Sequence, residues 1–348
     1  MVRQFMYGLL VLLLGCQCQS HSENRTDWSK LNNFVSPRYG VGMIVSPPFF
    51  KEAITTDRFI IAMGGTSDSE APALSDSWTH SIELEAPWSS DISTPTWSGR
   101  SDFGVASLLD GTIVLAGGQD ESGGISKNDM HVRQTDGKWV KVTENAPWKA
   151  RVGHRMTTCP DGSVIMAGGG NTRDGSFIHE YNDVWRLTGN MTHGWIWTQL
   201  TADGVAPWRK RWLFGLTCLS DNSVILTGGQ CGFTYLHDVW RLESHEGGSG
   251  NWTQLEDAPW SPRSQFGFVR MPDDTILLAG GLDADDCWSL RDASSSERKW
   301  VQEVSFSFGP RDQFGMVGLL NNTVVIAGGS YLNQGLHVYG DVWSLRIK

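Results

Sequence analysis

The sequence predicts an all-β fold, a six-bladed propeller with four antiparallel strands in each blade. Three observations indicate it. Six apolar segments each end in a pair of glycines, the same polar and aromatic residues flank every segment in the same order, and no stretch keeps the 3.6-residue apolar period of a helix. Repeats of about 50 residues are typical of propellers and solenoids, because one such unit cannot bury both of its faces alone.

The same residue types stand at corresponding positions in each repeat. The glycine pairs are residues 64–65, 117–118, 168–169, 228–229, 280–281 and 328–329. An arginine precedes each apolar run: Arg38, Arg100, Arg151, Arg211, Arg263 and Arg311. An aspartate follows each glycine pair: Asp76, Asp129, Asp183, Asp238, Asp286 and Asp341. A tryptophan stands two residues after every aspartate except Asp129, where His131 takes its place.

The second repeat illustrates the four strands in order. Its first strand begins at the arginine and covers residues 100–109, and Asp110-Gly111 forms the turn that follows. Such pairs suit type I′ hairpins, because Asp, Asn and Gly tolerate positive φ. The second strand, 112–118, is almost entirely apolar and is expected to be buried on both faces. The third strand carries the aspartate, which we expect to cap a turn or pair with neighbouring backbone, and the fourth begins at Trp139.

The two ends of the chain complement each other. The sixth repeat stops at residues 341–348, before its fourth strand. Near the start, the sequence WSKL at 28–31 matches the fourth-strand sequences WTQL at 197–200 and 252–255. We therefore expect the N-terminal strand to complete the last blade and close the ring.

Composition excludes several classes of protein. The chain has 348 residues, 28 Lys and Arg against 38 Asp and Glu, a net charge of −10, and 17 Trp. Low charge density with many tryptophans excludes a disordered chain. The acidic balance argues against nucleic-acid binding, which needs clustered cations to displace phosphate counterions. No run of Lys or Arg marks a membrane-surface patch.

The amino end predicts an export signal. An apolar run at residues 5–14 is too short to span a bilayer, which takes about 20 residues, so residues 1–18 are expected to be a signal peptide. In an alternative interpretation, residues 13–16 resemble a bacterial lipoprotein box, and Cys16 would carry a lipid anchor. The mature chain, 19–348, is expected to be a secreted single propeller with no membrane span. Four glycosylation sequons agree with a eukaryotic secretory route: Asn24, Asn190, Asn251 and Asn321.

Four cysteines remain after the signal segment. An even number in an exported chain suggests disulfides. We expect the pairs Cys159–Cys218 and Cys231–Cys287, since the members of each pair lie on neighbouring blades. The alternative is four small buried thiols.

The repeats resemble kelch repeats. The resemblance rests on the order of motifs: the glycine pair, then YNDVW at 181–185, then Trp197, in six related copies over residues 28–348. It implies a kelch propeller, a fold that serves as a peptide- or protein-binding module and in some members as an enzyme. Fold alone therefore implies no single activity.

Residue types found in every blade are expected to be scaffold, and residues that differ between blades at one end of the ring are better candidates for function. Five aromatic residues three positions before the arginines either pack between blades or form a ring that stacks sugars, and burial favours packing. They are Trp97, Trp148, Trp208, Trp260 and Phe308.

In peptide-binding kelch propellers, the ligand contacts residues just after the glycine pair and just after the repeat arginine. Transferred by resemblance, the ligand-binding set is Tyr39, Thr66, Asp102, Gln119, Asp120, His154, Asn171, Arg173, Trp212, Gln230, Gln265, Asp283, Asp312, Gln313, Ser330 and Tyr331. These residues are polar and aromatic, so they suit a protein or a glycan ligand.

Three functions remain open. We favour a monomeric extracellular module that binds a protein or a glycan at one mouth of the central channel. The second is a carbohydrate-active enzyme, resembling exported kelch sugar epimerases, mutarotases or oxidases, with candidate catalytic residues Asp102, His154, Arg155 and Asp312. The third is a structural component of an extracellular matrix.

A metal or cofactor is not expected. His179, His237 and His337 fall between second and third strands and are the candidate metal ligands. They lack the short-range spacing of zinc-finger or metalloprotease ligands. No phosphate-binding loop or dinucleotide fingerprint is present in the sequence.

Overall fold

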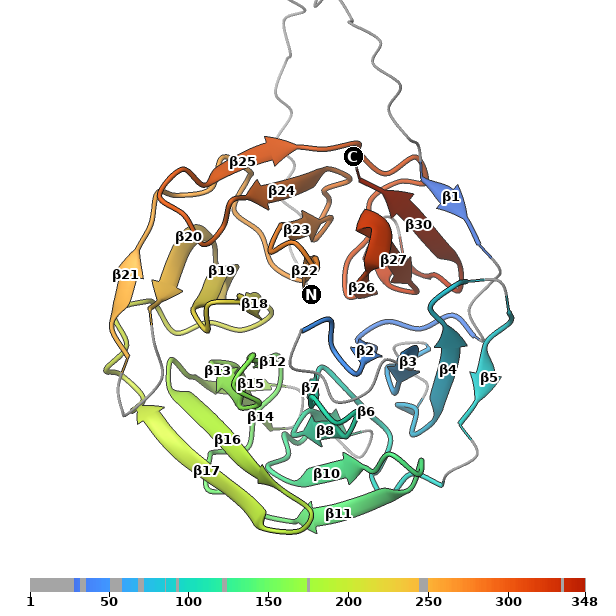
Figure 1. Cartoon of the computed structure of the whole chain (residues 1–348), viewed down its shortest axis with the longest axis vertical. Helices are drawn as coiled ribbons and strands as arrows, with labels where there is room; N and C mark the ends of the chain where they lie inside the picture. The colour runs from blue at the N-terminus through green and yellow to red at the C-terminus, as the bar shows by residue number, and fades with distance from the viewer. Residues whose placement is uncertain are drawn as a thin grey trace, which may run out of the picture.

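Six four-stranded antiparallel sheets stand around a central axis in the computed structural model (Figure 1), which confirms the predicted propeller. The structure describes residues 28–31, 36–50, 58–67, 72–84, 86–91, 94–120, 124–173, 176–243, 250–332 and 335–347. The predicted signal segment 1–18, Cys16 and the Asn24 sequon lie outside the described residues. Within the described ranges, the one helix is the short 3-10 turn Leu320–Asn322, so no helix there could cross a membrane.

From the inner to the outer strand, blades one to three are β2 (Gly42–Ser46), β3 (Phe59–Met63), β4 (Ser77–Ser81), β5 (Ser89–Ser90); β7 (Gly104–Ser107), β8 (Ile113–Ala116), β10 (Met130–Arg133), β11 (Trp139–Thr143); and β12 (Arg155–Thr158), β13 (Val164–Ala167), β16 (Val184–Asn190), β17 (Gly194–Thr201). Blades four to six are β18 (Gly215–Cys218), β19 (Val224–Cys231), β20 (Thr234–Leu242), β21 (Trp252–Gln254); β22 (Gly267–Arg270), β23 (Ile276–Ala279), β24 (Cys287–Arg291), β25 (Lys299–Gln302); and β26 (Gly315–Leu319), β27 (Thr323–Ala327), β30 (Val342–Arg346), β1 (Ser29–Lys30). Three short pairs stand outside the blades: β6 (Arg100–Ser101) with β9 (Gln119–Asp120), β14 (Gly170–Arg173) with β15 (Ser176–Glu180), and β28 (Ser330–Leu332) with β29 (Leu336–Val338).

The N-terminal strand closes the ring, as predicted. β1 pairs antiparallel with β30, with Ser29 opposite Ser344 and Lys30 opposite Trp343. The Leu31 amide donates to the Val342 carbonyl at 2.8 Å, which extends the pairing by one residue. The last blade therefore takes its outer strand from the other end of the described chain.

The second strands and the aromatic residues before each arginine form the cores between blades. Trp148 is 1% exposed and meets the fourth-strand Trp197 edge-on at 5.9 Å between ring centroids. The same arrangement recurs in the other blades, as Trp97 with Trp139, Trp208 with Trp252, and Trp260 with Trp300. These rings have almost no exposed surface, so packing is confirmed and a sugar-stacking ring is excluded for the four tryptophans.

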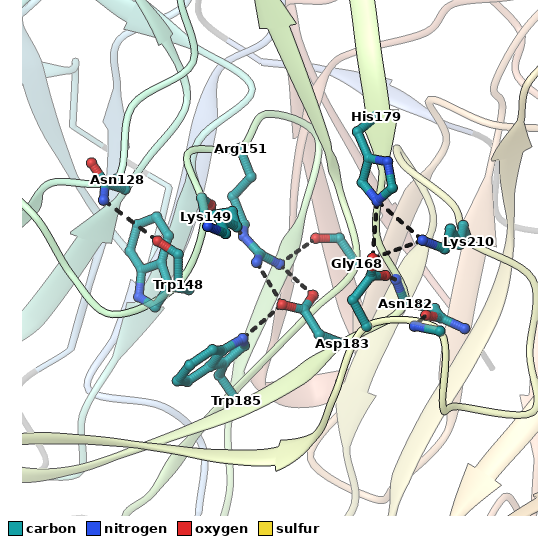
Figure 2. A network of polar contacts seen from close by, with 12 residues as sticks. Asn128, Trp148, Lys149, Arg151, Gly168, His179, Asn182, Asp183, Trp185 and Lys210 are labelled. Carbon is teal, nitrogen blue, oxygen red and sulfur yellow. Dashed lines mark hydrogen bonds and ion pairs between the residues drawn. The ribbon is translucent and has the colours of Figure 1, made fainter.

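The repeat arginine and aspartate form one buried network in each blade, shown for blade three in Figure 2. Arg151 donates to both carboxylate oxygens of Asp183 at 2.8 and 2.7 Å and to the Gly168 carbonyl at 2.8 Å. The Trp185 indole N–H donates to the same carboxylate at 2.8 Å. The network recurs as Arg38–Asp76, Arg100–Asp129, Arg211–Asp238, Arg263–Asp286 and Arg311–Asp341.

This network corrects the expected role of the repeat aspartate. Its main partners are the arginine and indole side chains rather than a turn or neighbouring backbone. In blade two, which has no tryptophan at this place, His131 Nε2 lies 3.0 Å from Asp129 and replaces the indole. Each network connects the segment just before the first strand to the start of the third strand, so it holds these two strands together at one end of the blade.

The turns between first and second strands differ from the predicted type. Gly111 has φ of 88°, whereas Asp110 does not have a positive φ, and a type I′ turn requires positive φ at both residues. Asp110 instead accepts a hydrogen bond from the Thr112 amide at 2.8 Å. The aspartate side chain thereby stabilises a turn that needs only one left-handed residue.

One of the two predicted disulfides is present. Cys159 and Cys218 are bonded between blades three and four, with Cα atoms 5.3 Å apart. The predicted Cys231–Cys287 bond is wrong, because both thiols are free. Cys287 is fully buried in the core between blades five and six, with Trp28 and Phe306, whereas Cys231 lies half-buried at the end of β19 in blade four.

Two of the predicted sequons lie at exposed or half-exposed places on the outer part of the ring. Asn251 is exposed just before β21. Asn190 ends β16, and its Oδ1 accepts hydrogen bonds from the Thr192 and His193 amides at 2.9 Å. Asn321 lies in the 3-10 turn Leu320–Asn322.

Candidate functional site

The residues after each arginine and after each glycine pair meet at one end of the channel, called here the mouth. Tyr39 and Thr66 exchange two backbone hydrogen bonds of 2.9 Å. Trp212 pairs with Gln230 and Asp312 with Ser330 in the same way, while Gln119 pairs with Ser101 and Ser126. The two sets of residues that the repeats singled out are therefore brought together, blade by blade, around the mouth.

A closed circle of six backbone hydrogen bonds forms just inside the mouth. It joins the residue two positions after each arginine: each amide donates to the carbonyl of its counterpart in an adjacent blade, over 2.8 to 3.2 Å. The six residues, called here the neck, are Gly40, Asp102, Gly153, Leu213, Gln265 and Gln313. The circle links the six blades directly around the axis, so it holds the entrance of the channel at a fixed width.

Every neck residue has a left-handed backbone, with φ between 50° and 65°. Glycine adopts this conformation at little cost, but Asp102, Leu213, Gln265 and Gln313 do so against the steric preference of a side chain. Strained residues of this kind concentrate at functional sites, where the surrounding structure holds them in place. All four side chains line a cavity of about 290 Å³ within the channel.

Blade three departs from the other blades at the inner end of its first strand. Five blades have glycine at the position four after the arginine: Gly42, Gly104, Gly215, Gly267 and Gly315. A Cβ at Gly42 would lie 2.5 Å from the Phe103 ring, so the neighbouring blade leaves no room there. Blade three has Arg155 instead, and its side chain lines the cavity.

The Arg155 guanidinium has hydrogen-bond donors that are not used within the described part of the chain. Its Nε donates to the Phe214 carbonyl at 2.9 Å, and its terminal amino groups have no hydrogen-bond partner among the described residues. Burial lowers the pKa of Arg155, and the negative charge of Asp102 counteracts that effect. Burial likewise raises the pKa of Asp102, against the influence of the Arg155 charge and a hydrogen bond from Ser101. Arg155 and Asp102 are thus oppositely charged residues that both line the cavity but do not form an ion pair with each other.

Asp312 is the second perturbed carboxyl at the mouth. Burial, followed by the negative charges of Asp283 and Asp102, raises its pKa to about 6, although Ser330 Oγ donates to it at 2.6 Å. Because its folded-state pKa lies above the ordinary value of 3.8, ionisation of Asp312 opposes folding, and the free energy of unfolding falls as pH rises from about 4 to about 6.

We expect Asp312→Asn to be more stable than the unaltered protein at pH 7, by on the order of 1 kcal/mol, because the amide keeps an acceptor for Ser330 without the charge. The difference should vanish below about pH 4, where the carboxyl is protonated in both states. Urea denaturation at pH 3.5 and pH 7 measures it. Equal gains at both pH values would contradict this account of Asp312.

His154 has no exposed surface with which to contact a ligand. Its ring is fully buried between blades, in the position that phenylalanine occupies in four other blades, and it packs beside Gly104, Gly117 and the Trp148 ring. Burial, followed by the charges of Arg151 and Arg155, holds its pKa well below the ordinary range. The structure therefore assigns His154 to packing, although the repeat position predicted contact with a ligand.

The remaining predicted residues divide into two groups. Asp120 is buried and forms an ion pair with Lys127, which gives it a structural role. Asn171 pairs with His179 in the β14–β15 hairpin, and Arg173 ends β14. Asp283 is exposed, and Tyr331 is half-buried on β28, so both belong to the mouth surface.

The three candidate metal ligands do not converge. Among the residues that the structure describes, no group of three or more His, Cys, Asp or Glu could hold a metal ion. His179 Nε2 lies 2.9 Å from Asp203 and 3.0 Å from Lys210 Nζ (Figure 2), and His237 Nδ1 contacts the Ala258 carbonyl. His337 is exposed on β29, in another blade.

Arg155, predicted from sequence as a candidate catalytic residue, also stands out when the six repeats are compared. Aligning the repeats on their arginines places it against five glycines, and a single large cation at a glycine position is a signal for function. The neck could not be predicted from sequence, since its hydrogen bonds join residues of different repeats, and the bond between Gly40 and Gln313 joins the first blade to the last.

Fold and site together define a six-bladed propeller with a polar, strained channel entrance, a class commonly used for protein binding. The family model of the KLHDC2/KLHL20/DRC7 Kelch-repeats domain matches residues 103–329, more than half of the chain, and the protein belongs to this kelch-repeat family.

A solved structure described as "Structure of YjhT" is similar in fold, with a TM-score of 0.69 and 16% sequence identity over 91% of this chain and 97% of that one. At this identity the likeness concerns the fold alone. No curated protein matches the sequence.

Proposed function

We propose that this protein is a secreted binding module that holds a protein or glycan ligand at the mouth of its channel. The proposal rests on the oppositely charged residues Arg155 and Asp102, which line a cavity of about 290 Å³. Gln265 and Gln313, whose backbones are left-handed, line the same cavity. Free guanidinium donors, a carboxylate and two amides suit a ligand group rich in hydrogen bonds.

The rigidity of the neck supports binding rather than a purely structural role. A preformed site loses little conformational entropy when a ligand enters, so more of the interaction energy appears as affinity. The cavity also shows that the channel interior is not filled by side chains, as a matrix component without a pocket would require. The side chain of His154, one of the four candidate catalytic residues, has no exposed surface with which to contact a substrate.

Arg155→Gly tests the proposal with little risk to the fold, because glycine is the residue of the other five blades. A glycan array and a displayed random-peptide library identify ligands of the unaltered protein. We expect the affinity for each ligand to fall at least tenfold in Arg155→Gly, because a buried charged hydrogen bond is lost.

Lys299→Ala is the matched control, since Lys299 is an exposed cation on the outer strand β25. Its affinities should equal those of the unaltered protein. Unchanged binding of every ligand by Arg155→Gly would contradict a site at the neck.

A further inference from the structure

The connections between second and third strands have different lengths around the mouth. In blade five the connection runs only from Ala279 to Cys287. Those of the other blades are longer: Met63 to Ser77, Ala116 to Met130, Ala167 to Val184, Ala327 to Val342, and in blade four a hairpin that continues β19 and β20 beyond Thr227 and Val239. The length of a connection limits how far it can extend above the ring, and the shortest one, in blade five, is called here the low edge of the mouth.

The connections of blades two to four brace one another. Ser126 Oγ and Thr172 Oγ1 lie 2.8 Å apart, which joins blade two to the β14–β15 hairpin of blade three. The Gly232 amide donates to Glu180 Oε1 at 2.8 Å, which joins that hairpin to the tip of the β19–β20 hairpin in blade four. These hydrogen bonds join the connections of blades two, three and four into one continuous side of the mouth that ends beside blade five.

The low edge at blade five is acidic. Asp283 and Asp285 are exposed there, and no cation among the described residues forms an ion pair with either. Their neighbourhood extends inward to Asp312 on blade six, whose pKa responds to the charge of Asp283. Negative charge therefore extends from the β23–β24 connection of blade five to Asp312, which follows the repeat arginine of blade six next to the neck residue Gln313.

Exposed apolar side chains of the neighbouring hairpins lie in the blades on both sides of this acidic edge. In blade four, the Phe233 side chain is completely exposed and Tyr235 is 39% exposed. In blade six, Leu332 is 72% exposed and Leu336 is 37% exposed. Blades four, five and six are neighbours in the ring (Figure 1), so the acidic connection of blade five lies between two blades that expose apolar side chains. We call these residues, with Asp283, Asp285 and Asp312, the saddle.

We propose that the ligand is an extended protein segment with a basic side chain next to apolar ones, and that it runs from the neck outward across the saddle. This inference rests on the proposed function and selects protein over glycan. A basic side chain complements the unpaired carboxylates of blade five. Exposed aromatic and aliphatic tips on both sides match apolar neighbours of that residue, whereas a glycan offers no comparable apolar partner for Leu332 and Leu336.

A phage-displayed library of random 12-residue peptides, selected on the purified protein, tests the inference. We expect recovered peptides to carry Lys or Arg beside apolar residues. Synthetic copies of these peptides, titrated in solution, should bind about tenfold more weakly to the double variant Asp283→Asn/Asp285→Asn and to Phe233→Ser. The double variant should also reduce the dependence of affinity on salt.

Two variants on the opposite end of the ring are matched controls. Glu297→Gln removes an exposed charge between β24 and β25, and Leu320→Ser removes an exposed apolar side chain between β26 and β27. Both should bind the peptides like the unaltered protein. Circular dichroism of all four variants should show an unchanged fold.

The outcomes separate this inference from the proposed function. Peptides that lose affinity in Arg155→Gly but not in the saddle variants would overturn the saddle and leave the neck site standing. Selection of acidic peptides, or of glycans only, would also overturn the saddle. Peptides that are insensitive to both sets of variants would overturn the two proposals together.

Discussion

Asp183→Asn should lower the free energy of unfolding by about 3–5 kcal/mol, because it leaves the Arg151 charge buried without its counter-ion. The Arg151 and Asp183 side chains are only 0% and 4% exposed, so water cannot replace the lost carboxylate. The Arg151 guanidinium also lies over the Tyr181 ring, 4.7 Å from its centroid. Guanidinium denaturation followed by tryptophan fluorescence measures the loss.

Asp136→Asn is the control for this prediction, since Asp136 pairs with Lys138 in an exposed turn and its midpoint of unfolding should not change. The double variant Arg151→Met/Asp183→Asn should recover part of the stability, because it removes the uncompensated charge. If Asp183→Asn unfolds at the midpoint of the unaltered protein, the repeated arginine network does not hold the blades.

Trp28→Ala should cost about 3–5 kcal/mol, as expected for truncating a buried tryptophan. Trp28 is 5% exposed, and its ring meets Phe306 and Phe308 edge-on at 5.1 and 5.5 Å between centroids. It is the fourth-strand tryptophan of the last blade, so its loss weakens the contact that joins the two ends of the ring. Thermal unfolding by circular dichroism should show a lower Tm.

Ser29→Ala is the matched control on the same strand. Ser29 is exposed, and its pairing with Ser344 uses backbone atoms that the change retains. Its Tm should equal that of the unaltered protein. A Trp28→Ala protein that unfolds like this control would show that ring closure does not depend on the β1 strand.

Much of the architecture could be predicted from local pattern. The glycine pairs, the aspartates and the WSKL match at 28–31 were sufficient for six blades and for closure by β1. Repetition made this possible, because all six blades pack in the same way and therefore show the same residue types at the same positions. The same logic separated scaffold from site: the recurring arginines are buried, and the recurring aspartates and tryptophans are buried or half-buried in the networks and cores of the blades.

Prediction failed where a residue's environment depends on which neighbour it faces. Cys231 and Cys287 lie on adjacent blades, yet Cys287 faces the core between blades five and six, away from blade four. His154 stands at a predicted ligand position, but the ring is buried between blades and takes the place of a phenylalanine. Blade order along the chain is not enough to tell these directions apart.

The sequence pattern alone thus predicted the number of blades, the strand order and the buried scaffold. The first follows from the number of repeats, and the other two follow from residues within one repeat. The neck, the Arg155–Asp102 pair and the saddle became visible only in three dimensions. Each is made of residues from different blades, far apart in the chain. Such residues meet because closing the ring places the same edge of every blade around one axis.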